Sequence, residues 1–167
     1  MTAVLITGGA RSGKSRYAEA RACAFTGRPI YIATAEALDQ EMAERIALHR
    51  TRRGPEWIER EVPLDLAQAL IETDGAGARL VDCLTLWLSN LLHANRDWSQ
   101  AVAELADSLC RQHSPVILVT NEVGLGIVPD NALARTYRDA AGHMNQTIAR
   151  VADEVEFVVA GLPMKLK

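Results

Sequence analysis

Eight residues near the start of the chain have the types and spacing of a phosphate-binding loop. They are Gly8-Gly9-Ala10-Arg11-Ser12-Gly13-Lys14-Ser15, and they follow the apolar run Val4-Leu5-Ile6. Glycines allow a tight turn that aims backbone N–H groups at phosphate oxygens, in front of the positive end of the next helix. Lys14 can then reach the β- and γ-phosphates, and the Ser15 hydroxyl can ligate Mg²⁺. The preceding strand and following helix favour a nucleoside triphosphate site over a chance glycine-rich loop.

A second candidate for the metal site is Asp82, which ends the apolar strand pattern Leu80-Val81-Asp82. In P-loop proteins an acidic residue after a strand supports the Mg²⁺ that the P-loop hydroxyl holds. An aspartate at this place can equally cap the helix that follows it. Because the chain also has a P-loop, the metal role is the favoured interpretation.

A basic stretch occupies the predicted helix Leu38–Arg53. Arg45, His49, Arg52 and Arg53 fall at i, i+4, i+7 and i+8 and so share one face. These cations repel one another unless an anion lies among them, and a triphosphate is the anion expected here. Neighbouring positive charge disfavours imidazolium, so His49 tends toward a neutral form that can attack phosphorus. From spacing alone, a solvated basic face with an incidental histidine is favoured.

Two carboxylates follow in Trp57-Ile58-Glu59-Arg60-Glu61-Val62, whose alternation predicts a short strand with Glu59 and Glu61 on one face. One of them can accept a hydrogen bond from a nucleotide ribose or base edge. A surface strand with salt bridges is the alternative.

The segment Thr120–Pro129 is a candidate substrate loop, because it follows the apolar strand pattern Val116-Ile117-Leu118-Val119. Glu122 can act there as a base toward an acceptor hydroxyl, as a second metal carboxylate, or only as a structural cap. Farther on, Arg138, Gly142 and Asn145 share a polar face at i, i+4 and i+7. The gap at glycine fits a bulky ligand or close helix packing.

Short apolar runs alternate with longer helical patterns, which predicts βαβ units and an α/β fold with a mostly parallel sheet flanked by helices. The predicted strands are Ala3–Thr7, Pro29–Ala33, Arg79–Asp82, Val116–Thr120 and Glu156–Ala160. The predicted helices are Lys14–Ala24, Leu38–Arg53, Leu64–Glu72, Leu84–Ala94, Ser99–Gln112 and Asn131–Ala152. In such a sheet, ligands bind outside the carboxyl ends of the strands.

The composition limits the class of protein. The 167 residues predict one domain, 1–167, and the net charge of −3 gives no global attraction to nucleic acid or anionic membranes. No apolar run is long enough to span a membrane, so we expect a cytoplasmic protein. Its three widely spaced cysteines fit packed thiols in a reducing compartment. No structural metal is expected, because His93, His113 and His143 lack ligand-like spacing.

Together these segments resemble the bifunctional adenosylcobinamide kinase/adenosylcobinamide-phosphate guanylyltransferase family of cobalamin biosynthesis. The resemblance spans nearly the whole chain in order. It rests on Ile6–Ser15, Tyr31-Ile32-Ala33-Thr34-Ala35, Glu41–Arg50, Asp82-Cys83-Leu84-Thr85 with Asn90-Leu91-Leu92, Val119–Pro129, and Arg138–Gln146. The segment around Asn95 is shorter than in some relatives, which weakens the transfer of corrinoid contacts.

The resemblance implies a RecA-like P-loop fold, a homotrimer, and two reactions. ATP or GTP phosphorylates adenosylcobinamide, and GTP then transfers GMP through a histidine to adenosylcobinamide phosphate, releasing pyrophosphate. The nucleophile falls on His49, which reverses the interpretation from spacing, with Lys14 as the second catalytic residue. The implied GTP contacts are Gly8, Gly9, Ala10, Arg11, Ser12, Gly13, Lys14, Ser15, Ala33, Thr34, Ala35, Arg50, Thr51, Arg52, Arg53, Glu61 and Asp82. Mg²⁺ falls on Ser15 and Asp82, and the substrate-side candidates are Glu122, Arg138 and Asn145.

Two other functions remain open at this stage. A P-loop kinase with a single reaction would transfer label only from the γ-phosphate of its nucleotide. A nucleotide-dependent switch would hydrolyse slowly without stimulation by an acceptor, but the chain lacks an Asn-Lys-x-Asp guanine-reading segment.

Overall fold

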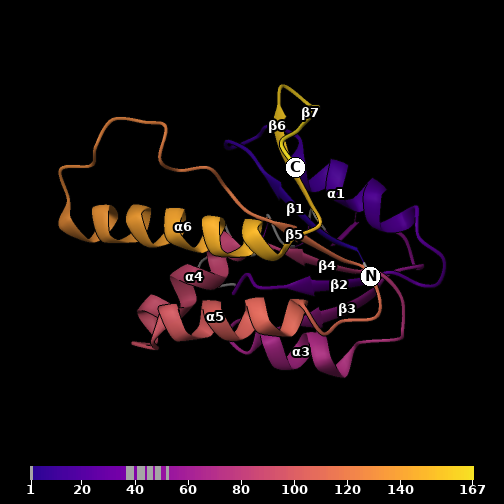
Figure 1. The fold of residues 1–167 in the computed structure, drawn as a ribbon. Helices are drawn as coiled ribbons and strands as arrows, with labels where there is room; N and C mark the ends of the chain where they lie inside the picture. The colour runs from indigo at the N-terminus through magenta and orange to yellow at the C-terminus, as the bar shows by residue number, and fades with distance from the viewer. Residues whose placement is uncertain (1, 37–39, 41–43, 45–46, 48–49, 52) are drawn as a thin grey trace.

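The computed structural model describes residues 2–36, 40, 44, 47, 50–51 and 53–167. Its centre is a seven-stranded sheet with the order β3-β2-β4-β5-β1-β6-β7 (Figure 1). The strands are β1 (Ala3–Thr7), β2 (Ile30–Ala33), β3 (Ile58–Glu61), β4 (Arg79–Asp82), β5 (Val116–Val119), β6 (Glu154–Val159) and β7 (Leu162–Lys165). The helices are α1 (Lys14–Cys23), α3 (Leu66–Glu72), α4 (Leu84–His93), α5 (Trp98–Leu109) and α6 (Ala132–Val151). The predicted helix Leu38–Arg53 lies largely outside the described residues.

All strand pairs are parallel except β6–β7. The carboxyl ends of the parallel strands β1, β2, β3, β4 and β5 therefore lie at the same end of the sheet. In an α/β fold, ligands bind at this end. Strand β5 separates the P-loop strand β1 from β4, which ends in Asp82. This is the mostly parallel, helix-flanked sheet that the sequence predicts.

Alternate strand residues pack on opposite faces of the sheet, because a strand points successive side chains to opposite sides. Leu5 belongs to the cluster that also includes residues of α3, α4, α5 and α6. Val4 and Ile6 belong to the cluster on the other face, with Ala18 and Ala22 of α1. Helices α3, α4, α5 and α6 thus cover one face of the central strands, and α1 covers the other. Both faces are therefore buried, which is why these strands are apolar throughout.

Strand β7 is a feature that the sequence analysis does not predict. A two-residue turn at Ala160 and Gly161, both with positive φ, joins it to β6 in antiparallel fashion. Pro163 lies inside β7, and a proline within an apolar run argues against a strand except at the edge of a sheet, which is where β7 lies. In the described part of the chain, no helix is both long and apolar enough to cross a bilayer.

Most predicted boundaries agree with the structure within two residues, and the differences have local causes. Helix α5 begins at Trp98, because Asp97 caps it by accepting hydrogen bonds from the N–H groups of Ser99 and Gln100 at 3.0 Å. Strand β6 begins at Glu154, two residues earlier than predicted, where it pairs with Val4 of β1.

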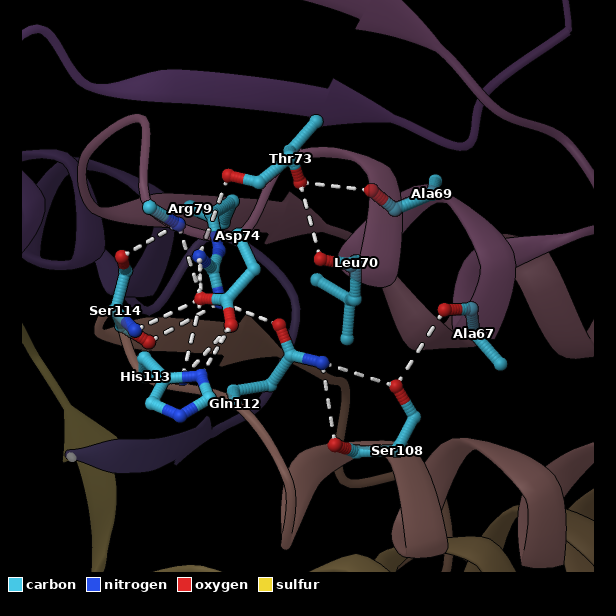
Figure 2. Close-up of polar contacts among 11 residues, drawn as sticks. Ala67, Ala69, Leu70, Thr73, Asp74, Arg79, Ser108, Gln112, His113 and Ser114 are labelled. Atoms are coloured by element: carbon cyan, nitrogen blue, oxygen red, sulfur yellow. Dashed lines mark hydrogen bonds and ion pairs between the residues drawn. The ribbon is translucent and has the colours of Figure 1, made fainter.

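A buried arginine stabilises the end of the sheet opposite the P-loop (Figure 2). Arg79 begins β4 and has no exposed surface. Its guanidinium donates to Asp74 Oδ1 at 2.8 Å and to Gln112 Oε1 at 2.6 Å. The Asp74 carboxylate also accepts from the backbone N–H groups of His113 and Ser114. Partial burial raises the pKa of Asp74, but hydrogen bonds from Arg79, Ser114 and His113 outweigh it and hold the pKa far below its usual range.

An Asp74→Asn variant is expected to lose about 3 kcal/mol of unfolding free energy at pH 7, because Arg79 would remain a buried charge without its carboxylate. A carboxylate whose pKa is lowered by folding adds stability above its unfolded pKa of about 3.9. This contribution is lost progressively as pH falls below that value. The difference between variant and wild type should therefore shrink below about pH 4. Urea unfolding at a series of pH values measures this difference in unfolding free energy. The exposed Asp107→Asn variant is the matched control. Equal stability of both variants at pH 7 would contradict the assigned role.

Candidate active site

The P-loop lies between β1 and α1, as the motif predicts, and close packing fixes its path. A Cβ on Gly8 would lie 2.5 Å from the carbonyl oxygen of Val158, so only glycine fits beside β6. Gly13 caps α1 with a φ of 93°, a conformation that favours glycine. The first turn of α1 therefore follows the loop directly, with its free N–H groups and positive dipole end toward the site.

Lys14 is almost fully buried, with 8% of its surface exposed. Its ammonium donates to the carbonyl oxygen of Gly9 at 2.9 Å, which places the cation inside the loop. Burial lowers the pKa of Lys14, and the nearby Cys83 and Asp82 offset part of this shift. A buried cation beside the loop is suited to bind a phosphate, because desolvation strengthens its attraction to an anion.

Asp82 ends β4 on the same edge of the sheet. Its Oδ2 accepts a hydrogen bond from the Tyr31 hydroxyl at 3.1 Å. Within the described part of the chain, Oδ1 has no hydrogen-bond partner. Mg²⁺ prefers oxygen ligands and takes one or two from protein together with phosphate oxygens and waters. The Ser15 hydroxyl in the first turn of α1 and Asp82 Oδ1 therefore fit this ion.

The segment after β2 is fixed by a buried threonine. Thr34 Oγ1 accepts from the backbone N–H of Cys83 at 2.8 Å and donates to the carbonyl oxygen of the same residue at 2.7 Å. Asn90 of α4 donates to the carbonyl oxygens of Thr34 and Pro63 at 2.8 and 3.0 Å. These bonds place Ala33, Thr34 and Ala35 beside the residues that follow β4.

Arg50 and Arg53 have carboxylate partners. Arg50 binds Glu59 Oε2 at 2.6 Å and Glu61 Oε1 at 3.1 Å, so both glutamates do face one side of β3, as the alternation predicts. Arg53 binds Glu59 Oε1 at 2.7 Å, and its side chain is only 4% exposed. Glu59 and Glu61 therefore form salt bridges, as the alternative for this strand predicts, and the nucleotide contacts of the two arginines stay predictions.

Other members of the basic stretch lie outside the described residues, namely His49, Arg45 and Arg52. Thr51 is described, and its hydroxyl donates to the carbonyl oxygen of Ala47 at 3.1 Å. The roles of His49 and Arg52 therefore stay predictions. Arg50, which follows His49 in the sequence, contacts Glu61 at the carboxyl end of β3.

The three predicted substrate-side residues make different contacts. Glu122 lies next to the P-loop, since its backbone N–H donates to the carbonyl oxygen of Gly8 at 3.1 Å, while its carboxylate accepts from Gly124 N–H. Asn145 joins α6 to the end of β5 by accepting from Thr120 Oγ1 at 2.8 Å. Arg138 instead pairs with its neighbour Asp139 at 2.9 Å. A Cβ on Gly142 would meet no atom within 4 Å, so this gap is open and not used for helix packing among the described residues.

Sequence reasoning missed two contributors to the site. Tyr31 contacts Asp82, yet a tyrosine inside an apolar strand has no pattern that distinguishes it from core. Gly161 of the β6–β7 turn supports the P-loop: its N–H donates to the carbonyl oxygen of Ser12 at 2.8 Å, and a Cβ on Gly13 would lie 3.1 Å from its Cα. A turn so distant in sequence gives no local signal of this contact.

Two solved structures are similar to this chain in fold. A protein from Pyrococcus horikoshii OT3 is similar with a TM-score of 0.60 and 10% identity, over 99% of this chain and 86% of that one. The P4 protein from bacteriophage φ6, solved in complex with ADP, has a TM-score of 0.50 and 14% identity, over 97% of this chain and 52% of that one. At these identities the likeness concerns the fold, which is that of P-loop NTPases.

Curated relatives are similar over nearly their whole length. The bifunctional adenosylcobalamin biosynthesis protein CobP of Pseudomonas aeruginosa is 51% identical over 168 residues, which cover 98% of this chain and 96% of that protein. The corresponding CobU of Salmonella typhimurium is 44% identical, and that of Escherichia coli 43%, each over 98% of this chain and 99% of the relative.

A family profile described as cobinamide kinase / cobinamide phosphate guanyltransferase matches residues 4–166. The matched range includes the P-loop, Asp82 and the segments around them. The chain therefore belongs to the cobinamide kinase / cobinamide phosphate guanyltransferase family, as an enzyme built on a P-loop sheet.

Proposed function

We propose that this enzyme phosphorylates adenosylcobinamide with ATP or GTP, and then transfers GMP from GTP to adenosylcobinamide phosphate through a guanylylated His49. The observation that carries the proposal is a buried Lys14 inside the P-loop, near enough to Asp82 at the end of β4 for that carboxylate to act on its pKa, in a chain of this family. One nucleotide site can serve both reactions if either the γ- or the α-phosphorus is presented to a nucleophile.

In the kinase step, the substrate hydroxyl attacks the γ-phosphorus, the bond to the bridging oxygen breaks, and the nucleoside diphosphate leaves. Lys14 and the N–H groups of the P-loop hold the charge that develops on the phosphate oxygens. Glu122 takes the hydroxyl proton, a role that its position beside Gly8 supports. Ser15 and Asp82 would hold Mg²⁺, which would neutralise a further part of the phosphate charge.

In the guanylyl step, an imidazole nitrogen of His49 attacks the α-phosphorus and pyrophosphate leaves. An oxygen of the substrate phosphate then attacks the same phosphorus, the P–N bond breaks, and His49 is regenerated with adenosylcobinamide-GDP as product. Splitting the transfer in this way replaces one difficult step by two easier ones.

The substrate-side contacts and the assembly belong to the same proposal. The open gap at Gly142 and the position of Asn145 support contacts of the bulky corrinoid with this side of α6. The homotrimer is also part of the proposal: a neighbouring copy would cover the apolar side chains of Leu125, Ile127 and Leu133, which are 81%, 98% and 66% exposed. The molar mass of the protein in solution gives the number of chains in the oligomer.

Incubation of the wild-type enzyme with labelled GTP tests the two-reaction proposal. We expect α-labelled GTP to label the protein and γ-labelled GTP not to do so, with a bond that acid cleaves, as a phosphoramidate should. Adenosylcobinamide phosphate should then remove the label from the protein. Transfer of γ-label to adenosylcobinamide without any protein labelling would contradict the guanylyl step and support a kinase alone.

A further inference from the structure

Three side chains connect the basic stretch to the predicted metal aspartate in an unbroken series of contacts. Glu59 of β3 binds the guanidinium of Arg53 at 2.7 Å. The guanidinium carbon of Arg53 lies 3.5 Å from the ring centroid of Tyr31 in β2. The Tyr31 hydroxyl in turn donates to Asp82 Oδ2 of β4 at 3.1 Å. The series therefore crosses the three neighbouring strands β3, β2 and β4 and ends at Asp82, the last residue of β4.

Burial makes these contacts specific. Tyr31 is 5% exposed and the Arg53 side chain 4%, so water does not compete for their polar groups. The ring of Trp57 packs edge-on against Tyr31, with centroids 6.0 Å apart.

We propose that Tyr31 is a positioning residue that orients the Asp82 carboxylate for Mg²⁺, with the Arg53 guanidinium stacked on the Tyr31 ring. The hydroxyl occupies Oδ2, which leaves Oδ1 for the ion. Residues that hydrogen-bond to a metal ligand fix its orientation. Their loss commonly lowers the metal affinity about 10- to 100-fold. The inference rests on the proposed function only in assigning Asp82 to the metal.

Arg53 packs on the Tyr31 ring and also keeps one donor without a hydrogen bond. Its Nε and Nη2 both donate to Glu59 Oε1, at 3.2 and 2.7 Å. Its Nη1 is buried, has no hydrogen-bond partner among the described residues and lies 3.9 Å from Glu19 Oε1. One face of the guanidinium covers the Tyr31 ring, a stable arrangement for arginine. The contact with Tyr31 is therefore compatible with the GTP contact that the family resemblance implies for Arg53.

Tyr31→Phe tests the proposal, because it removes only the hydroxyl and keeps the ring under Arg53. We expect the affinity for Mn²⁺, measured by electron paramagnetic resonance with a non-hydrolysable GTP analogue bound, to fall about tenfold or more. Binding of the same analogue in EDTA should stay unchanged. The matched control is Tyr17→Phe, which removes another tyrosine hydroxyl bound to a carboxylate, Glu156, at 3.1 Å, and should leave Mn²⁺ affinity unchanged.

Wild-type Mn²⁺ affinity in Tyr31→Phe overturns the proposal. Weaker binding of the analogue in EDTA overturns it as well, because the hydroxyl would then act on the nucleotide and not on the metal. Protein labelling by α-labelled GTP is measured separately on the wild type, so a failure of the two-reaction proposal is distinguishable from a failure of this one.

Discussion

A His49→Ala variant is expected to carry no covalent GMP after incubation with α-labelled GTP, whereas it should phosphorylate adenosylcobinamide at close to the wild-type rate. The reason is chemical. Alanine has no nucleophile to attack the α-phosphorus, while the kinase step needs only the substrate hydroxyl and the P-loop. The label retained on denatured protein measures the first reaction, and γ-label transferred to the corrinoid measures the second.

The matched control for this variant is His143→Ala, which removes an exposed histidine of α6 that packs edge-on against Trp98. It should label like the wild type. Loss of both reactions in a correctly folded His49→Ala protein would contradict separate roles for the two nucleophiles. Retention of the acid-labile label would move the covalent intermediate to another residue.

A Lys14→Ala variant is expected to lose both reactions, each by about 10²–10³-fold, the usual effect of removing one preorganised group that stabilises transition-state charge. Lys14 is buried and donates to Gly9 inside the loop, so no water-exposed cation can take its place. Both reactions start from a triphosphate in the same loop. The two label-transfer assays measure the effect, together with nucleotide binding at equilibrium.

Arg16→Ala is the control for Lys14→Ala, because Arg16 is an exposed cation two residues farther along α1. It should retain both activities. If Lys14→Ala abolished only one reaction, the two would use different nucleotide sites, and the assignment of one shared P-loop would be wrong.

The sequence predicts most of the fold because each strand of the parallel sheet is a short, nearly continuous apolar run between turn signals. The P-loop strand and Arg79–Asp82 agree with the structure residue by residue. The antiparallel β7 could not be predicted in the same way, since Pro163 and its exposed side chains resemble a surface segment. Its position follows from the hairpin turn at Ala160 and Gly161, where a non-glycine residue adopts a positive φ.

The candidate site was predictable where a motif fixes both residue type and spacing, and not where contacts join distant strands. Gly8–Ser15 and Asp82 belong to the first class. The partners of Arg50 and Arg53 belong to the second, because helical spacing shows which cations share a face but not which carboxylates of β3 neutralise them. Tyr31 was missed for the same reason: only the register of β2 against β4, with Tyr31 opposite Leu80, brings its ring near Asp82.

The contact between Gly161 and the P-loop also has a consequence for biosynthesis of the protein. A ribosome releases residues 8–15 early, but the β6–β7 hairpin that braces them belongs to the far end of the domain. A truncated or unfinished polypeptide therefore holds its glycine loop without the backbone support of Ser12 by Gly161. We therefore expect the glycine loop to gain its full backbone support only after the ribosome has synthesised the β6–β7 hairpin.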